Sequence, residues 1–375
     1  MKNYLNQTFI LLFLIAGLTI AQTNELTFEQ AYLYSSPRLT KALPQISISG
    51  TENSYLITEG EKIIRISLPN NEETLVLDYE ELNKNMPDGF DLSRSSAHTE
   101  NYSKFILESE NDLHFYDKDN NKFQRLTSDS EEEENPTFSP DGNFIAYTKN
   151  NNLYVYDLLK SEEIQLTQDG TDLIYNGYAS WIYYEEILGR GSRYQAFYWS
   201  PDSKKITYMQ FDDTKVPTFT LFNADGVHGE LEVMHYPKPG DPNPDVKLGV
   251  VNIETKKTIW IDNTLEKGNY IAWPMFTSDS KRLVYQKMNR GQDDLEVMIT
   301  NIENPEPKRI YGETQKTWVE FLDDLTLLEN EDGFLIRSEV EGWHHIYHYN
   351  LGGKLINKIT DGEWSVKDIA HVDEE

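Results

Sequence analysis

The chain has 375 residues, no cysteine and a formal net charge of −29, from 63 acidic and 34 basic residues. This charge argues against binding to nucleic acid or to an anionic membrane surface, and it favours a soluble protein that attracts cationic groups. Without disulfides, a chain of this length needs two domains or one repeated architecture to bury enough apolar surface. The 23 tyrosines and the aromatic content of 12% are typical of a strand-rich protein.

Residues 1–21 have the pattern of a signal peptide. Lys2 supplies positive charge, Phe9–Leu18 is an apolar core too short to span a bilayer comfortably, and Thr19–Ala21 resembles a cleavage site. We therefore expect an exported chain that begins near Gln22, is periplasmic or extracellular, and has no membrane contact after cleavage. An uncleaved membrane anchor is the alternative.

Three later segments share an aromatic residue, a tight turn containing aspartate, and then a strand of about five residues. These segments are Phe138–Thr148, Trp199–Met209 and Phe276–Gln286. A second strand follows two of them, at Asn152–Asp157 and at Leu295–Thr300. Four short strands in every stretch of about 40 to 60 residues are typical of the blades of a β-propeller.

The pattern predicts an all-β protein, with a β-propeller of four-stranded blades over residues 47–375 after an N-terminal segment at 22–46. In the first blade the expected strands are Ser54–Thr58 and Lys62–Ser67. We count six blades, and their predicted extents are 47–77, 105–117, 135–167, from 198 onward, 271–302 and 317–360.

Two adjacent carboxylates lie in an aromatic segment that we place on a loop between the third and fourth blades. Tyr184–Leu188 has the composition of a short helix that stops at Gly189. Successive side chains of a helix point about 100° apart, so Glu185 and Glu186 would flank one point. This geometry suits a small cation such as an amine. A solvated acidic turn is the alternative.

Three histidines near the C-terminal end suggest a metal site. However, Gly342–Tyr349 is aromatic and follows a turn, which favours a strand. His344 and His348 would then lie about 13 Å apart on one face, too far to share an ion. We therefore predict no metal ion, and nothing in the sequence indicates a cofactor.

Three other polar segments are assigned to loops. The acidic run Asp129–Glu134 is expected to be a solvated loop, and Asp212 with Asp213 is expected to cap or close a turn after a strand. Pro237–Pro244 is expected to be a rigid loop between strands.

Several of these segments, taken together and in order, resemble the propeller domain of the dipeptidyl peptidase IV family, a branch of the prolyl oligopeptidase-like serine peptidases. The segments are Asp172–Gly177, Trp181–Glu186, Tyr198–Asp202, Tyr208–Asp213 and His235–Val251, and the likeness is clear from about Glu134 to Asp361.

The resemblance implies a role for the carboxylate pair. In that family the two glutamates of a Trp-x-Tyr-x-Glu-Glu motif grip the free α-amino group of the peptide substrate, and they match Glu185 and Glu186. Neighbouring candidates for the same pocket are Trp181, Tyr184, Arg190 and Arg193. The resemblance also implies an exopeptidase that releases Xaa-Pro or Xaa-Ala dipeptides, in which this part gates access and clamps the amino group.

Two features depart from the family pattern. The family's nucleophile lies in a Gly-x-Ser-x-Gly elbow of a C-terminal α/β-hydrolase domain, and that pattern does not occur in these 375 residues. The family's propeller also has eight blades. Either the catalytic domain is supplied separately and the chain is a fragment, or the chain is a free-standing, non-catalytic propeller that binds peptides or a protein.

The expected partners follow from these alternatives. They are peptides with a free N-terminus, an α/β-hydrolase domain or subunit, and a second copy of the chain, since family members are commonly dimers. A further departure is in the second blade, where the family carries an arginine that holds the substrate carbonyl or orients the glutamates. Phe105–Leu113 contains no arginine, so another cation takes this role or the pocket holds the substrate less tightly.

Overall fold

The computed structural model describes residues 27–33, 46–48, 53–262, 268–330 and 332–374. The predicted signal peptide and most of the predicted N-terminal segment lie outside the described residues. The chain divides into two compact units at the boundary between Thr74 and Leu75. None of the helices in the described part of the chain has the length and hydropathy of a membrane-spanning segment.

The first unit contains a short helix and most of one sheet. Helix α2 (Phe28–Tyr32) begins with a capping box, in which Thr27 Oγ1 accepts the Gln30 amide and the Gln30 side chain accepts the Thr27 amide. The sheet is the first blade, and its last strand crosses the boundary between the units. Its antiparallel strands are β1 (Ile46–Ile48), β2 (Ser54–Glu59), β3 (Lys62–Ser67) and β4 (Glu72–Asp78). The two strands expected in this blade are confirmed as β2 and β3.

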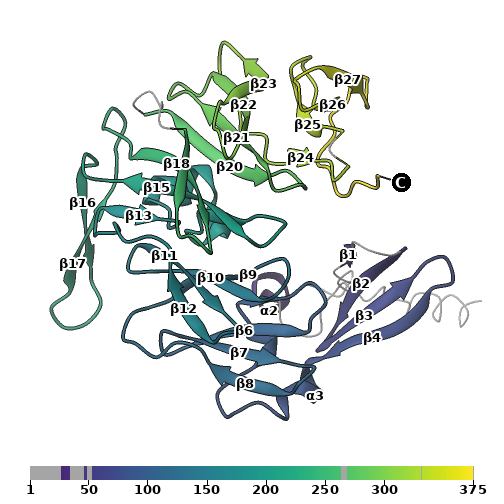
Figure 1. Ribbon diagram of the computed structural model, residues 1–375, viewed down its shortest axis with the longest axis vertical. Helices are drawn as coiled ribbons and strands as arrows, with labels where there is room; N and C mark the ends of the chain where they lie inside the picture. Colours follow the sequence, from purple (N-terminus) through teal and green to yellow (C-terminus); the bar gives the residue numbers. More distant parts are fainter. Residues whose placement is uncertain (1–26, 34–45, 49–52, 263–267, 331, 375) are drawn as a thin grey trace, which may run out of the picture. The chain divides into compact units, whose positions relative to one another are not determined.

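The second unit holds the second to sixth blades (Figure 1). Four of these are antiparallel sheets of four consecutive strands, as predicted. The second blade has β5 (Ala97–His98), β6 (Lys104–Ser109), β7 (Asp112–Asp117) and β8 (Lys122–Arg125). The third has β9 (Glu134–Phe138), β10 (Phe144–Lys149), β11 (Asn152–Asp157) and β12 (Glu162–Gln165). Two short helices, α3 (Tyr79–Asn83) and η1 (Leu92–Arg94), precede the second blade.

The last two blades have the same arrangement. The fifth has β20 (Tyr270–Phe276), β21 (Arg282–Met288), β22 (Asp294–Asn301) and β23 (Lys308–Thr314). The sixth has β24 (Thr326–Leu327), β25 (Phe334–Ser338), β26 (His345–Tyr349) and β27 (Leu355–Lys358). The predicted end of the fifth blade at Ile302 is wrong, because β23 continues the sheet. This outer strand begins with two exposed basic residues, Lys308 and Arg309, and lacks the apolar run of the inner strands.

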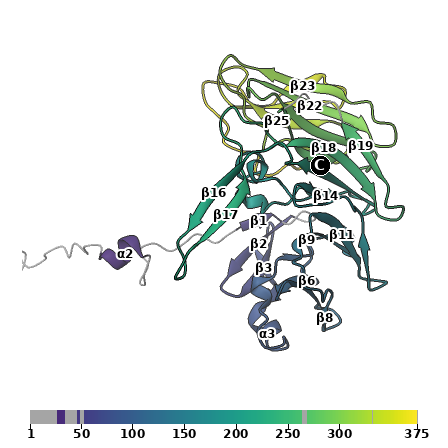
Figure 2. The ribbon, with the colours of Figure 1, turned by 90° about the vertical axis from the view of Figure 1, so that its left-hand side faces the viewer.

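The fourth blade has five strands and carries two insertions. Its strands are β13 (Ile174–Asn176), β14 (Phe197–Trp199), β15 (Lys205–Asp212), β18 (Asp245–Asn252) and β19 (Thr258–Asp262). A separate hairpin, β16 (Thr218–Asn223) with β17 (Glu230–His235), stands away from this sheet (Figure 2). The blade therefore begins at Ile174 and not near Tyr198.

The acidic segment also lies inside the fourth blade, not between the third and fourth blades as predicted. Both β13 and β14 pair with β15, at Asn176 opposite Gln210 and at Phe197 opposite Tyr208. Between these pairs, Met209 accepts the amide of Gly177 and donates its own amide to Ala196. Residues 177–196 are therefore an insertion into one edge strand, held closed at its base.

The repeated aspartate turns have the same geometry in the third, fourth and fifth blades. In each turn a hydroxyl donates to the aspartate two residues later, at 2.6 Å; the pairs are Ser139 with Asp141, Ser200 with Asp202, and Thr277 with Asp279. The next residue after each aspartate has a positive φ, at Gly142, Ser203 and Ser280. This left-handed conformation turns the chain back into its strand.

The same turns also join neighbouring blades. The Asp141 amide of the third blade donates to Ser203 Oγ of the fourth at 3.1 Å. The Asp202 amide of the fourth donates in the same way to Ser280 Oγ of the fifth at 3.0 Å. A serine at the left-handed position therefore closes its own turn and accepts a bond from the preceding blade.

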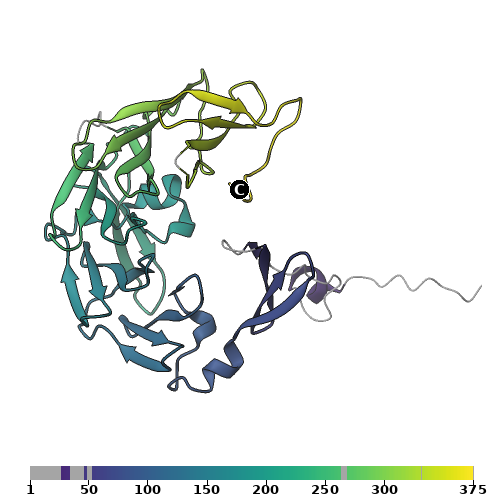
Figure 3. The ribbon, with the colours of Figure 1, turned by 45° about the vertical axis from the view of Figure 1, so that its right-hand side comes forward.

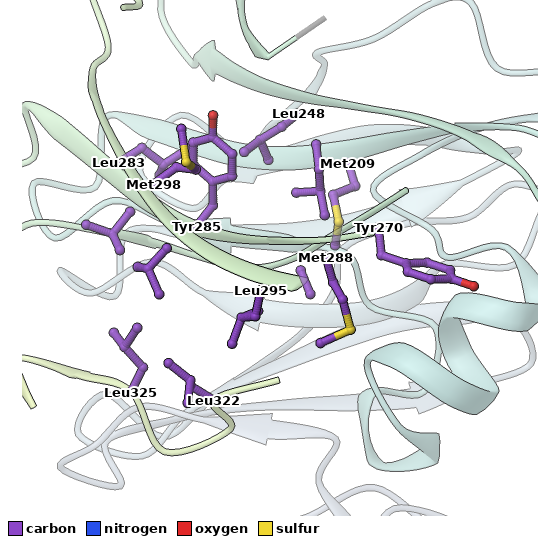
Figure 4. Close-up of a cluster of buried hydrophobic side chains, with 14 of the residues drawn as sticks. Met209, Leu248, Tyr270, Leu283, Tyr285, Met288, Leu295, Met298, Leu322 and Leu325 are labelled. Atoms are coloured by element: carbon purple, nitrogen blue, oxygen red, sulfur yellow. The ribbon is translucent and has the colours of Figure 1, made fainter. Parts of the chain in front are cut away.

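Apolar side chains fill the space between successive sheets, which follow one another in chain order within this unit (Figure 3). One cluster joins the second and third blades, another joins the third and fourth, and the largest joins the fourth, fifth and sixth. The largest cluster includes Met209, Leu248, Tyr285 and Leu295 (Figure 4). The insertion at residues 177–196 contributes to this same cluster.

Candidate functional site

The two glutamates lie on a π-helical turn, η2 (Tyr183–Ile187). Leu188 donates its amide to Tyr183 O at 2.7 Å, which is the wider spacing of a π-helix, whereas the Tyr184 amide reaches Ser180 O at 3.0 Å. Gly189 ends the turn with φ +78°. The predicted short helix and its stop are thus present, with π geometry in place of the expected α geometry.

The inner side of this turn is anchored in the largest core cluster. Tyr183 is fully buried, and its ring meets Phe211 edge-on at 4.8 Å between centroids. Its hydroxyl accepts the Ile271 amide of the fifth blade at 3.2 Å. Ile187 and Leu188 are buried in the same cluster. The glutamates therefore lie on a turn whose other side chains are buried in the core or packed against it.

Glu185 is paired with an arginine from the same insertion. The Arg190 Nε lies 2.9 and 2.8 Å from the two carboxylate oxygens, and Arg190 Nη2 also contacts Oε1. The hydrogen bond from Arg190 lowers the pKa of Glu185 below its ordinary value. The Glu185 side chain is 17% exposed, whereas Glu186 is exposed. The two carboxylates thus differ in accessibility, which the sequence did not predict.

The two predicted arginine candidates separate in the structure. Arg190 opens the short helix η3 (Arg190–Ser192) and turns back onto Glu185. Arg193 follows η3 in a left-handed conformation and is exposed. Arg190 is therefore positioned to orient Glu185, and Arg193 is not brought to the pair by any contact in the described part of the chain.

The two predicted aromatic candidates hold the turn from different sides. Tyr184 stacks on Tyr194 with centroids 3.8 Å apart, and Tyr194 stacks in turn on Tyr178 at 4.9 Å. Trp181 lies 4.4 Å from Tyr236, which follows the exposed hairpin. These ring contacts fix the aromatic side chains that lie near the acidic pair in sequence.

A third carboxylate reaches this aromatic stack from the third blade. Glu134 is the first residue of β9 and accepts a hydrogen bond from the Tyr178 hydroxyl. Burial raises the pKa of Glu134. The prediction that Asp129–Glu134 is a solvated loop is therefore wrong for its last two residues, since Glu134 is partly buried in β9 and Glu133 is buried beside Lys149. The run of acidic residues suggested a loop, although β9 begins within it, at Glu134.

The adjacent aspartates after β15 have different environments. Asp212 accepts the Thr214 amide and hydroxyl and closes a turn, as predicted. The side chain of Asp213 instead points into the protein, is 2% exposed and accepts the Ser180 hydroxyl. The period of two along a strand was the available signal, because neighbouring residues point to opposite faces.

Of the three histidines near the C-terminal end, His345 and His348 lie in β26 of the sixth blade and His344 directly precedes it. His345 lies in β26 and is buried, with its ring nitrogens near Thr360 Oγ1 and Gly362 O. Within the described ranges, no three His, Cys, Asp or Glu side chains are grouped as metal ligands would be. The loop Pro237–Pro244 joins β17 to β18, as expected.

Comparison with known proteins identifies the family. A family model described as the dipeptidyl peptidase IV N-terminal region matches residues 90–375. The dipeptidyl peptidase 4 of Trichophyton rubrum is 33% identical over 254 residues, which are 63% of this chain and 32% of that protein. The probable dipeptidyl peptidase 4 of Emericella nidulans is 32% identical over 262 residues, 64% of this chain and 33% of that protein.

A solved structure has the same fold. The dipeptidyl peptidase 4 of Porphyromonas gingivalis superposes with a TM-score of 0.75 and 23% identity, over 88% of this chain and 48% of that one. The chain therefore spans about a third of the length of the curated relatives and about half of the solved one. Its β-propeller of four-stranded blades and its match over residues 90–375 show that the chain belongs to the dipeptidyl peptidase IV N-terminal region family.

Proposed function

We propose that the chain is the propeller part of an exported dipeptidyl peptidase IV-like serine exopeptidase, which releases Xaa-Pro or Xaa-Ala dipeptides. In this proposal the propeller gates access, and Glu185 with Glu186 binds the α-amino group of the substrate. The observation that carries it is the pair of glutamates on a π-helical turn whose other face is packed in the core.

The Glu185–Arg190 contact fixes the orientation of one carboxylate of the proposed amine site. Both oxygens of this carboxylate already accept hydrogen bonds from a guanidinium, so the group is ionised and oriented. An ammonium about 4 Å from a carboxylate gains roughly 1 kcal/mol in water and roughly 4 kcal/mol at an effective dielectric of 20. Glu186 is exposed and adds a second negative charge next to it.

Arg190 also supports one of the two alternatives for the missing arginine of the second blade. The Phe105–Leu113 segment forms most of β6 and the first two residues of β7, joined by a tight turn at Glu110 and Asn111, and it leaves no long loop there. In our proposal Arg190 takes over the orientation of Glu185 from within the insertion. The substrate carbonyl then has one fewer fixed cation, and selection depends more on the amino group.

Binding without hydrolysis is the second candidate function. It requires only the amine site, whose two glutamates both lie on η2. The same amine site serves either function, and they differ in whether an α/β-hydrolase domain or subunit acts on the bound peptide. Export and a homodimeric state remain parts of the proposal that rest on the sequence and on the family.

The proposal is tested by measuring the affinity of the purified chain for the dipeptide Ala-Pro and for N-acetyl-Ala-Pro by calorimetry. Glu185→Gln and Glu186→Gln each remove a charge with little change of shape. Loss of a charge-assisted hydrogen bond costs about 1.5–3 kcal/mol, so each variant should bind Ala-Pro roughly ten- to a hundredfold more weakly. The N-acetylated peptide should bind poorly to all variants.

Glu131→Gln is the matched control, because this carboxylate lies exposed in the acidic run before β9 and carries the same charge. It should leave the affinity for Ala-Pro within about twofold, since single exposed charges contribute little. Equal affinities of the parent, Glu185→Gln and Glu186→Gln for Ala-Pro would contradict the proposed amine site.

A further inference from the structure

Asp213 lies beneath the acidic turn and has an unusual environment for a carboxylate. It follows β15 directly, and it is 2% exposed. Its Oδ2 accepts the hydroxyl of Ser180 at 2.9 Å, and Ser180 is itself 2% exposed. Its Oδ1 is buried and has no hydrogen-bond partner in the described part of the chain. Such a half-satisfied buried carboxylate is costly in free energy.

Ser180 connects this carboxylate to the glutamates. It immediately precedes the segment from Trp181, and its carbonyl oxygen accepts the Tyr184 amide at 3.0 Å. That bond is the first of the helical turn, and Glu185 is the next residue after Tyr184. A shift of Ser180 would therefore move the backbone on which the acidic pair stands.

Asp213 also lies where the turn meets the base of the exposed hairpin. Its amide donates to Leu173 O beside β13, and its carbonyl accepts the Val216 amide just before β16. The carbonyl of Val216 in turn lies 2.7 Å from His235 Nδ1 at the end of β17. Asp213 is therefore hydrogen-bonded to the residues that precede β13 and β16 and to Ser180.

The titratable groups that face Asp213 are Asp212, His235 and Tyr175. None of the ion pairs in the described ranges gives it a lysine or arginine partner. Burial, the largest cause, raises the pKa of Asp213 to about 6, against the ordinary 3.8. The group is therefore ionised at neutral pH and becomes neutral in mildly acidic solution.

We propose that Asp213 is a positioning residue for amine capture: as a carboxylate it holds Ser180, and through Ser180 the turn that carries Glu185 and Glu186. The inference rests on the proposed function and deepens it. Under this proposal, the affinity of Glu185 and Glu186 for the amino group depends on a residue that does not contact the substrate.

The direction of the pH effect on stability follows from the raised pKa. A carboxyl whose pKa is higher in the folded state stabilises the fold below its ordinary pKa, and this contribution is lost as the pH rises through about 6. At pH 7.5 ionised Asp213 therefore lowers stability. A carboxylate that served only to stabilise the fold would raise the free energy of unfolding at pH 7.5. Measurements of stability and of binding can therefore distinguish that role from a role in positioning the turn.

The test compares the parent chain with Asp213→Asn, Ser180→Ala and the double variant, using Ala-Pro as ligand at pH 7.5 and pH 5.5. We expect each single variant to bind about tenfold more weakly at pH 7.5, because one charge-assisted hydrogen bond is lost. The double variant should be no weaker than either single one, since both changes remove the same bond. The parent should lose affinity towards pH 5.5, and Asp213→Asn should not.

Thermal unfolding supplies the second measurement. Asp213→Asn should unfold at pH 7.5 at a temperature equal to or above that of the parent. Asp212→Asn is the matched control, because that carboxylate closes an exposed turn one residue away. It should keep the parent's affinity and pH profile.

The outcomes separate the two proposals. A parent chain that shows no preference for Ala-Pro over N-acetyl-Ala-Pro contradicts the amine site and this inference with it. A parent that binds Ala-Pro while Asp213→Asn matches Asp212→Asn overturns only the role of Asp213. A lower unfolding temperature of Asp213→Asn at pH 7.5, or an acid loss of affinity that persists in it, overturns that role as well.

Discussion

The fourth and fifth blades are built from the same aspartate turn and the same antiparallel meander, and they differ in what is inserted into them. The fifth blade runs from β20 to β23 without interruption. The fourth has residues 177–196 inserted into its edge strand and the hairpin β16–β17 inserted between β15 and β18. The fifth blade therefore shows the strands that a blade of this fold contains, and the fourth blade shows where two further segments are inserted.

The two insertions in the fourth blade are themselves unlike. Residues 177–196 bury Tyr183, Ile187 and Leu188 against the fifth blade. The hairpin instead exposes apolar side chains on its own, with Phe222 67% and Leu231 68% exposed. The acidic pair is mounted on the insertion that is anchored in the core, which holds its geometry fixed.

The largest expected effect tests the contrast between buried side chains in the fifth blade and exposed side chains in the hairpin of the fourth. Leu295 is fully buried in β22, so Leu295→Ala should lower the free energy of unfolding by about 2–5 kcal/mol, through lost burial and the cavity left behind. Phe222→Ala, at an exposed site, should change it by about 0.5 kcal/mol or less. Urea unfolding of both variants measures this. Similar losses in both would mean that the hairpin is packed against something in solution.

The second prediction tests the link between the insertion and the fifth blade. Tyr183→Phe removes the hydroxyl that accepts the Ile271 amide and leaves that buried amide without a partner. This should cost about 1–3 kcal/mol of unfolding free energy, and it should also weaken the binding of Ala-Pro because the turn loses an anchor.

Tyr208→Phe is the control for that variant. Tyr208 is equally buried, but its hydroxyl pairs with the Thr258 side chain, which lies away from the insertion. It should affect stability without affecting the affinity for Ala-Pro. If Tyr183→Phe lowered stability and left affinity unchanged, the contact with the fifth blade would be structural only.

Much of the fold was predictable because the turn chemistry is local. An aromatic residue, a hydroxyl residue and an aspartate at fixed spacing specify a turn that closes on itself, and three copies gave the phase of the blades. The hairpin was missed although both of its strands alternate polar and apolar residues, because it lies outside the aspartate-turn repeat that marks the blades. The start of the fourth blade was missed because the insertion divides one strand into β13 and β14.

The candidate site was predictable only in part. The sequence located Glu185, Glu186 and the aromatic residues around them, since these are contiguous. It could not assign Arg190 rather than Arg193 to Glu185, because that depends on how the chain turns after Gly189. Glu134 and Asp213 reach the site region from other strands, and only the packing of the sheets brings them there.

The smallest expected effect concerns Arg190, whose pairing with Glu185 is exposed to solvent on the arginine side. Arg190→Gln should change the affinity for Ala-Pro at pH 7.5 by about fivefold or less, since exposed ion pairs contribute about 0–1 kcal/mol. Its signature lies in the pH dependence. Arg190 lowers the pKa of Glu185, so this carboxylate stays ionised to a lower pH in the parent than in the variant.

The affinity of the parent divided by that of Arg190→Gln should therefore be nearly constant above pH 6. This ratio should rise below about pH 5, where an ordinary glutamate begins to be protonated. Using the ratio removes the effect of Asp213, which titrates in both proteins. Arg193→Gln is the matched control, because this exposed arginine removes the same charge from the same insertion and should leave the ratio flat. A loss above about tenfold at pH 7.5 would instead mean that Arg190 contacts the peptide itself.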